Sequence, residues 1–225
     1  MPITVQTLRD AVARSHTRME QLEDQLNAAD ALLGDGDTGS MLARVIEKMA
    51  ATDLSAMSDI GAAFNALARA IMSATGSSLG TLLATALLAL AKATKGRSEI
   101  PWPELSSLIG QAIEAMRIRG GASLGDKTIL DALHRVAQSL AGITDASTAG
   151  DAACAAACAA ACAAEAGARA ALEHFKPLPC KIGRARLFPE KSTGAHDPGM
   201  LALALLLEQS DSSESSEASF LKTVP

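Results

Sequence analysis

Residues 151–167 read DAACAAACAAACAAEAG, a run in which alanine fills most positions. Alanine has the highest helix propensity of all residues, and its small side chain lets a neighbouring helix approach closely. We therefore place a long helix at residues 147–175 and expect it to pack tightly against other helices. Three cysteines recur along one side of it, and with Cys180 we interpret them as small buried residues rather than a metal or redox site: Cys154, Cys158 and Cys162.

The composition of the whole chain agrees with an all-α fold. Of its 225 residues 48% are hydrophobic but only 2% are aromatic, so strand-forming side chains are too few for a β-sandwich, and we expect no strands. The net charge of −5, without a cluster of Lys or Arg, argues against nucleic acid as a partner. No segment has the pattern of a signal peptide or a membrane-spanning helix, so we expect a soluble cytoplasmic protein without a membrane partner.

Hydrophobic periodicity between turn signals predicts eight helices. We place them at residues 4–29, 40–50, 58–73, 81–95, 104–117, 127–141, 147–175 and 199–208, in one domain over residues 1–209 with an acidic, Ser-rich tail at 210–225. Because successive helices run antiparallel, the loops after the first, third, fifth and seventh meet at one end of an up-and-down barrel or bundle. These four loops are also the polar ones, which predicts a composite site at that end.

Three carboxylates, those of Asp30, Asp35 and Asp37, surround a Gly-rich turn that reads LGDGDTG at residues 33–39. Carboxylates this close repel one another unless a cation lies between them, and hard oxygen ligands favour Mg²⁺ or Ca²⁺. The spacing does not match an EF-hand, so Mg²⁺ completed by water and phosphate oxygens fits best. The alternative is a turn in which Asp and Gly only supply hydrogen bonds and left-handed backbone.

Two further loops have the composition of a nucleotide site. Residues 75–81, TGSSLGT, precede an apolar helix, so the hydroxyls of Ser77 and Ser78 and the backbone N–H groups converge where a phosphate is favoured. Ordinary N-capping is the alternative. The glycines of GGA at residues 120–122 would let an adenine approach the backbone, although a plain turn explains them equally well.

The remaining polar motifs lie at the start of the sixth helix and in the long link before the last. Residues 125–133 read GDKTILDAL, where Asp126 is a candidate N-cap and Asp131 a candidate exposed residue. The link at residues 176–198 is too long for a structureless connection without a function, and Arg184 or Arg186 in it could neutralise a phosphate. His196 by itself is more often structural than catalytic.

Together these motifs resemble those of the nucleotide-binding L subunit of dihydroxyacetone kinases. The resemblance extends over residues 5–208 and rests on four ordered motifs: Asp30 with LGDGDTG, GDKT with LDAL, GRA at residues 183–185, and HDPG at residues 196–199. It implies an eight-helix barrel that holds ATP or ADP through two Mg²⁺ ions at one end. It implies no catalytic side chain, because phosphoryl transfer of this kind depends on positioning and electrostatics.

The resemblance also implies roles for individual residues. The Mg²⁺ ligands would be Asp30, Asp35 and Asp37. Ser77 and Ser78 would hold phosphates, Gly121 with Ile129 or Leu130 would line the adenine pocket, and other residues would close over the nucleotide. The full set of implied nucleotide-binding residues is Thr38, Ser77, Ser78, Gly121, Ile129, Leu130, Arg184, Asp197, Pro198 and Gly199.

For the reaction, the resemblance implies transfer of phosphate to dihydroxyacetone or a related short keto sugar, held by a separate K-type subunit. Thr38 stands where ATP-dependent members commonly have Cys and members fed by a phosphotransferase-system phosphocarrier commonly have His. The phosphate source therefore stays open, as does the oligomeric state, a homodimer included. The alternative function is a non-catalytic, nucleotide-binding regulatory module; a metal-dependent phosphatase has less support, because no general base is evident.

Overall fold

The computed structural model describes residues 2–143 and 150–209, without the side chains of residues 150–155. The all-α class is confirmed, and the expected tail at 210–225 lies outside the described residues. The helices are α1 (Val5–Ala31), α2 (Thr38–Ala50), α3 (Ile60–Ala74), α4 (Ser78–Ala93), α5 (Leu105–Gly120), α6 (Ile129–Leu140), α7 (Gly150–Phe175), α8 (Pro189–Ser192) and α9 (Pro198–Leu207), with 3-10 turns η1 (Trp102–Glu104) and η2 (Arg184–Leu187).

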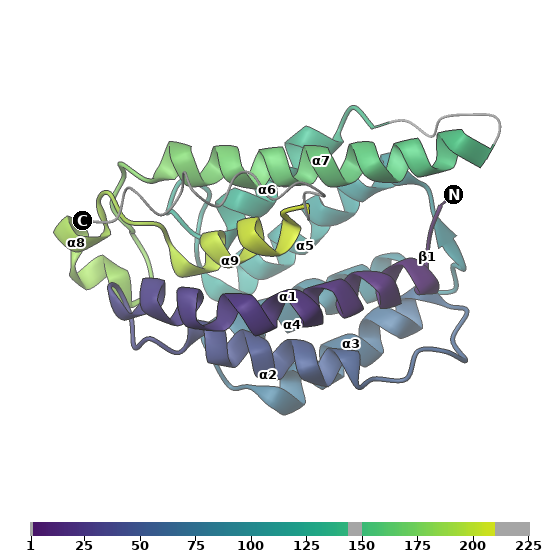
Figure 1. Ribbon diagram of the computed structural model, residues 1–225, viewed down its shortest axis with the longest axis horizontal. Coiled ribbons are helices and arrows are strands. Elements are labelled where there is room, and N and C mark those ends of the chain that lie inside the picture. Colours follow the sequence, from purple (N-terminus) through teal and green to yellow (C-terminus); the bar gives the residue numbers. More distant parts are fainter. Residues whose placement is uncertain (1, 144–149, 210–225) are drawn as a thin grey trace.

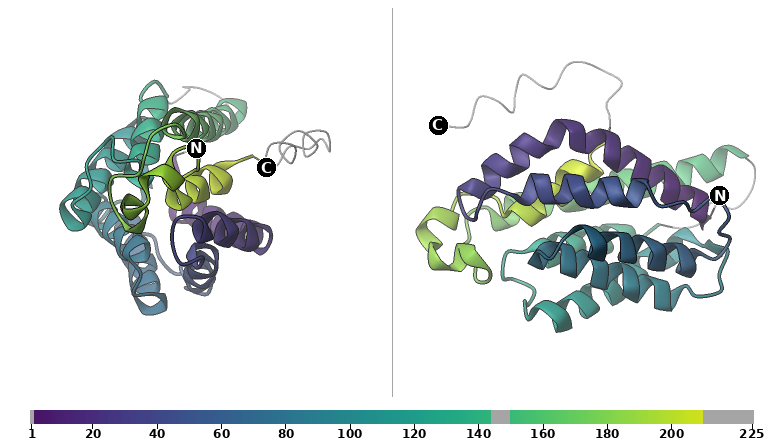
Figure 2. Two further views of the ribbon diagram at one scale, coloured as in Figure 1. Left: turned by 90° about the vertical axis from the view of Figure 1, so that its left-hand side faces the viewer. Right: turned by 90° about the horizontal axis from the view of Figure 1, so that it is seen from below.

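The long helices form a ring in the order of the chain (Figures 1 and 2). Each of α1 to α6 packs on the next helix along the chain, and α9 closes the ring between α7 and α1. The expected meeting of loops at one end is seen at the start of α9, where Gly199 lies against the starts of α4 and α6. A Cβ added to Gly199 would lie 3.5 Å from Cβ of Ile129 and 3.8 Å from Cδ1 of Leu79. We call this the loop end; α8 marks it in Figure 1.

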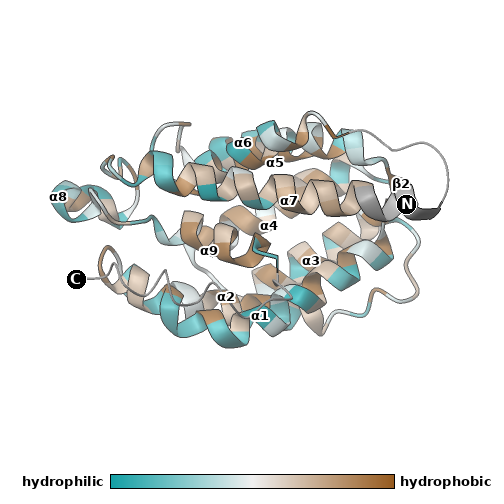
Figure 3. Cartoon of the chain, turned by 45° about the horizontal axis from the view of Figure 1, so that its top comes forward, coloured by the Kyte–Doolittle hydropathy of each residue, from teal (hydrophilic) through white to brown (hydrophobic). Residues whose placement is uncertain are grey.

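Apolar side chains fill the inside of the ring. In α1 the buried residues Met19, Leu22 and Leu26 follow helical spacing and pack on the buried face of α2. Helix α9 is hydrophobic on nearly every position and lies between α1 and α7 (Figure 3). A helix that is apolar all round must be enclosed, and α9 packs against α1, α6 and α7.

Helix α7 contacts its neighbours through alanine, as expected from its sequence. Its buried stripe includes Ala156, Ala160, Ala164 and Ala168, and the last three pack with residues of α6 and α9. Because this stripe takes the inner face, Cys158 and Cys162 are exposed, and the expectation that they are buried was wrong. Cys180 is buried as expected, whereas the side chain of Cys154 lies outside the described residues.

A short sheet departs from the expectation of no strands. Strands β1 (Ile3–Thr4) and β2 (Glu99–Ile100) pair antiparallel, with Ile3 opposite Ile100. Both isoleucines are buried in one apolar cluster, which explains why this pair forms without any longer strand-forming run. Among the described residues, no helix combines the length and the apolarity needed to cross a bilayer.

Candidate functional site

The three aspartates predicted to bind metal lie together at the loop end. Each offers a carboxylate oxygen, and the three oxygens lie within 4.8 Å of one another. Asp30, in the last turn of α1, is only 7% exposed, whereas Asp35 and Asp37 are exposed in the loop that follows. Among the side chains of residues 2–143 and 156–209, no other group of three or more His, Cys, Asp or Glu is arranged in this way.

Asp30 also shapes the loop. Its Oδ2 accepts the backbone N–H groups of Gly36 and Asp37 at 3.0 Å and of Thr38 at 3.3 Å, at the start of α2. Gly36 has φ +77°, a conformation that glycine adopts without strain. A Cβ at Gly34 would collide with Oδ1 of Asp30. The alternative interpretation of this motif as a hydrogen-bonded turn is therefore correct as far as it goes, but it leaves Asp35 and Asp37 unexplained.

A cationic side chain reaches the same carboxylates from the link between α7 and α9. Arg184 in η2 forms an ion pair with Asp35, and this hydrogen bond is the main cause that lowers the pKa of Asp35 below its usual value. Asp37 and Asp30 add to the negative potential around the Arg184 guanidinium. The loop end thus concentrates negative charge at a point that already attracts a cation.

The donor set suits a magnesium ion. Oxygen ligands of one octahedral Mg²⁺ ion lie about 3 to 4 Å apart, close to the spread of the three carboxylate oxygens. Asp35 and Asp37 are exposed, and the partner of Asp35 is the likewise exposed Arg184, whereas Asp30 is held by its backbone hydrogen bonds. Three carboxylates leave coordination positions for water and phosphate, which is the usual way in which Mg²⁺ is bound.

The start of α4 has the geometry of a capped helix with open space above it. The Ser77 hydroxyl caps the helix by accepting the Gly80 N–H at 3.0 Å, as the N-capping alternative predicts. Ser78 is exposed in the first turn, where backbone N–H groups have no helical acceptor. A Cβ added to the preceding Gly76 would meet no atom within 4 Å. An anion can therefore approach the N-terminal end of α4 although Ser77 caps it.

The residues expected around adenine occupy two environments. Gly121 ends α5 with φ +71° and is exposed. Ile129, the first residue of α6, lies beside Gly199 at the start of α9. Leu130 is buried in the core in the same apolar cluster as Met116. Ile129 is buried in this cluster as well, and of the two residues it is the one that lies beside Gly199 at the loop end.

The start of α9 contains a carboxyl group with a perturbed pKa. Asp197 caps the helix, and its Oδ2 accepts the Met200 N–H at 2.9 Å. Desolvation raises the pKa of Asp197 to about 6, an effect that its helix-end hydrogen bonds and the nearby Lys127 only partly offset. Pro198 and Gly199, the other residues of this turn, are buried.

The start of α6 differs from the expectation. Thr128, not Asp126, is the N-cap, in a capping box completed by Asp131, whose carboxylate accepts the Thr128 N–H at 2.8 Å. A second oxygen of Asp131 accepts the Gly125 N–H at 2.5 Å, so this side chain is buried rather than exposed. Asp126 instead accepts the Ser123 N–H at 2.8 Å within the preceding turn. Both carboxylates therefore hold the α5–α6 loop in shape.

Two features of the loop end had no prediction from the sequence. Lys127 is fully buried, with its Nζ atom among backbone carbonyls of the link, although charged residues are almost always exposed. Large apolar side chains are exposed in the connections at this end of the barrel: Leu32, Leu124, Leu178, Leu187 and Phe188. Leucine or phenylalanine within a polar connection is the signal that could have found them.

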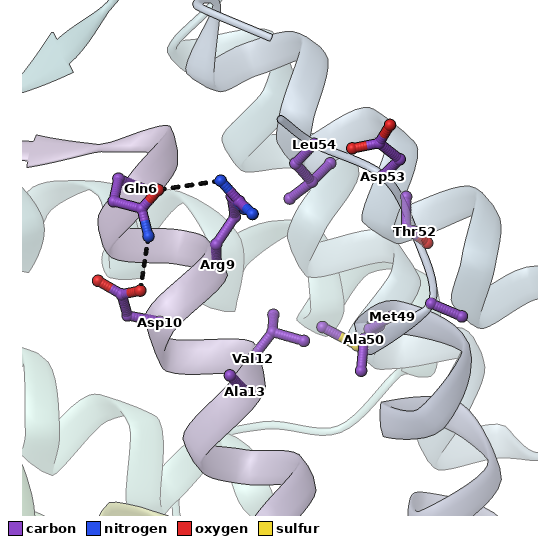
Figure 4. Close-up of a pocket in the computed structure, with 11 residues that line it drawn as sticks. Gln6, Arg9, Asp10, Val12, Ala13, Met49, Ala50, Thr52, Asp53 and Leu54 are labelled. Carbon is purple, nitrogen blue, oxygen red and sulfur yellow. Dashed lines mark hydrogen bonds between the residues drawn. The ribbon is translucent and has the colours of Figure 1, made fainter. Parts of the chain in front are cut away.

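A hollow of about 430 Å³ lies at the other end of α1, against the segment that follows α2 (Figure 4). The Gln6 side chain forms hydrogen bonds with the side chains of both Arg9 and Asp10, so these polar groups of the hollow are already paired with one another. About 20 residues of helix separate the hollow from Asp30, roughly 30 Å at the rise of an α-helix. It is therefore not part of the site at the loop end.

The amino-acid sequence of the chain is similar to those of known proteins. Residues 32–211 match the DAK2 domain family. The chain is 29% identical to the PTS-dependent dihydroxyacetone kinase, ADP-binding subunit DhaL, of Lactococcus lactis, over 92% of this chain and 96% of that subunit. It is 31% identical to the D-erythrulose kinase of Mycolicibacterium smegmatis, over 87% of this chain and 33% of that enzyme.

The fold matches a solved structure as well. The native dihydroxyacetone kinase of C. freundii superimposes with a TM-score of 0.65 and 25% identity, over 92% of this chain and 34% of that enzyme. The chain thus corresponds to nearly the whole of the Lactococcus subunit, but spans only about a third of the two longer enzymes.

Proposed function

The chain belongs to the DAK2 domain family, that of the dihydroxyacetone kinase L subunits, and we propose that it is the nucleotide-binding phosphotransferase subunit of a dihydroxyacetone-type kinase. The observation that carries this proposal is the group of three aspartates at the end of the barrel where α2, α4, α6 and α9 begin. Carboxylates for a cation and helix N-termini for an anion are the two halves of a metal–phosphate site.

We assign the metal site to Asp30, Asp35 and Asp37, with two Mg²⁺ ions as the proposed number. Bound Mg²⁺ neutralises negative charge on phosphate oxygens. Asp30 keeps its hydrogen bonds to the start of α2 and fixes the loop, while Asp35 exchanges its partner Arg184 for the metal. Arg184 then becomes available to a phosphate, for which a guanidinium is well suited.

The nucleotide, ATP or ADP, takes its position from the helix starts. Ser78 and the N-terminal end of α4 bind phosphate, with Ser77 holding that end in shape, and Thr38 contributes at the start of α2. Ile129 and Gly121 lie against the adenine, and the buried Leu130 supports them from beneath. The turn of Asp197, Pro198 and Gly199 borders the site at the start of α9.

The acceptor belongs on a partner of K type, which holds dihydroxyacetone or a related short keto sugar. The exposed apolar side chains at the loop end support this part of the proposal, because a protein partner that covers this end would bury them: Leu32, Leu124, Leu178, Leu187 and Phe188. ATP and a phosphotransferase-system phosphocarrier are the two candidate phosphate sources, and Thr38 marks neither.

One assay tests the proposal. The purified chain is mixed with a K-type subunit and dihydroxyacetone, and phosphorylated product is measured with Mg-ATP in one arm and with the phosphorylated phosphocarrier in the other. We expect product in at least one arm. Asp35→Asn should abolish it, whereas the matched control Asp24→Asn, on the exposed face of α1, should keep it. Absence of product in both arms, with Mg-nucleotide still bound, would instead favour the non-catalytic regulatory module.

A further inference from the structure

The link between α7 and α9 folds around one buried ammonium group. Lys127 is 1% exposed, and its Nζ atom donates to three backbone carbonyls of the link: Leu178 at 2.7 Å, Ser192 at 2.7 Å and Lys176 at 3.2 Å. Three acceptors require three protons on Nζ, so this pattern describes the charged form of the side chain. Hydrogen bonds from a charged donor are about twice as strong as neutral ones, so the link is held firmly here.

The backbone conformation of Lys127 is one that favours glycine, so the lysine side chain must contribute something that offsets the strain. Its φ is +62°, and it is the only residue other than glycine with positive φ in the described part of the chain. Glycine would adopt this conformation without the steric strain that a side chain adds. A lysine in its place indicates that the three hydrogen bonds outweigh that strain.

The acceptors of Lys127 come from both ends of the same loop. The Gly194 N–H bonds the Lys176 carbonyl at 2.8 Å and closes residues 176–194 into a compact loop. Inside it, the Cys180 N–H bonds the Ser192 hydroxyl at 3.0 Å. Loops of this type are usually filled by their own side chains. Here the loop's own Cys180 and Ser192 side chains are buried, and Lys127 is buried as well. Because Lys127 belongs to the α5–α6 loop, it ties the link to a different part of the barrel.

The loop of residues 176–194 carries Arg184, the residue that reaches Asp35. We propose that Lys127 is a positioning residue: its buried ammonium fixes this loop so that Arg184 faces the three aspartates, and it thereby sets how fast a bound Mg-nucleotide is released. The second half of this proposal rests on the proposed function, whereas the first half concerns the chain alone. The proposal gives Lys127 no contact with metal or nucleotide, because its Nζ atom already donates to three backbone carbonyls of the link.

Lys127→Met tests the proposal, because methionine has nearly the same length and no donor. The matched control is Lys181→Met, which removes an exposed charge from the same loop and keeps its backbone hydrogen bond to Asp126. The first readout needs no ligand: trypsin cleavage after Arg184 and Arg186, relative to cleavage elsewhere in the chain. The second is the dissociation rate of Mg-ADP, well below the melting temperature.

We expect Lys127→Met to raise both rates at least about tenfold, the effect of losing one charge-assisted hydrogen bond, while Lys181→Met leaves both near wild type. If Lys127 acts through Arg184, the variant Arg184→Ala releases Mg-ADP quickly on its own, and adding Lys127→Met changes the rate little further. Additive effects of the two substitutions would overturn the role through Arg184.

A purely structural role makes a different pattern. Lys127→Met would then lower the melting temperature and raise cleavage throughout the chain alike, and that result would overturn the proposal. If Lys127→Met does not fold, Ser192→Ala removes the bond to the Cys180 N–H and is expected to loosen the same loop in the same assays. If the wild-type chain binds no nucleotide, the proposed function fails, yet selective cleavage of the loop in Lys127→Met would still establish what Lys127 holds.

Discussion

Arg184 and Asp35 form an ion pair that joins the link before α9 to the loop after α1. The carboxylate that Arg184 contacts is one of the three proposed metal ligands, so the guanidinium and a divalent ion compete for it. Both side chains are more than half exposed, so water and salt screen the pair and it adds little to stability. The pair is therefore weak enough to be exchanged for a metal.

Replacing Arg184 is expected to strengthen the binding of the metal ion alone and to weaken the binding of the metal–nucleotide complex. Arg184→Gln frees Asp35, so Mn²⁺ alone binds up to about fivefold more tightly, the value of one exposed ion pair. Mg-ADP leaves faster because its guanidinium contact is gone. Calorimetry with Mn²⁺ and a dissociation assay with ADP measure the two effects. Arg186→Gln, in the same turn, is the control, and equal changes in both variants would contradict the exchange.

Asp35→Asn is expected to abolish stabilisation of the chain by Mg-nucleotide. A ligand that binds only the folded state raises the melting temperature, so loss of the metal site removes the shift. Circular dichroism should show unchanged helical content, because Asp35 is exposed and contributes nothing to the core. The control Asp24→Asn keeps the shift. A normal Mg-ADP shift in Asp35→Asn would rule out a role of this carboxylate in binding.

The close approach of α1 and α2 positions the aspartate loop, and glycine permits it. A Cβ at Gly39 would collide with the Glu23 carbonyl and lie 2.9 Å from Oδ1 of Asn27. Gly39→Ala is therefore expected to destabilise the fold by about 1–3 kcal/mol in urea unfolding, as overpacking does. Gly110→Ala in α5, where a Cβ meets no atom within 4 Å, should instead stabilise the chain by about 0.5–1 kcal/mol. Equal effects of the two substitutions would show that the approach is not tight.

Asp197 makes a predictable contribution to the pH dependence of stability. Its pKa is about 6 in the folded chain against a usual value of 3.8, so the folded state binds the proton more tightly than the unfolded state. This group therefore lowers the free energy of unfolding as the pH rises from about 4 to about 6, by about 2–3 kcal/mol. Lys127 and Asp131 face it with opposite charges and are included in that shift.

Asp197→Asn removes the ionisation and keeps a side chain able to cap α9. Between pH 4 and pH 7, the variant should gain stability relative to wild type by the amount that Asp197 loses. Urea unfolding of both proteins at the two pH values measures the difference, in which the other carboxylates cancel. Parallel pH profiles would mean that Asp197 is not desolvated in solution.

The helices and their common end followed from local signals. Residues 75–80, for example, ended one apolar periodic segment and opened the next, and α3 and α4 meet there as expected. Because each helix runs antiparallel to the one before it, alternate loops lie at the same end, and this alone predicted that the four polar loops meet there. The start of α6 was placed two residues early, because Asp126 and Thr128 are both good N-caps and only the reciprocal bond with Asp131 distinguishes them.

Contacts that depend on the path of the long link could not be predicted. The ion pair of Arg184 with Asp35 requires the fold of residues 176–197, for which periodicity gives no information. The burial of Lys127 contradicts the usual exposure of lysine, and only the carbonyls around its Nζ atom explain it. Cys158 and Cys162 were misplaced because an alanine-rich helix has several small faces, and tertiary packing selects the one that is buried.

Metal binding by the three aspartates is tested by a crystal structure of the chain with Mn²⁺ and ADP, using anomalous scattering at the manganese edge. We expect anomalous peaks within bonding distance of the carboxylates of Asp30, Asp35 and Asp37 and of phosphate oxygens of ADP at the start of α4. Manganese away from these carboxylates, or ADP bound outside the loop end, would contradict the assignment.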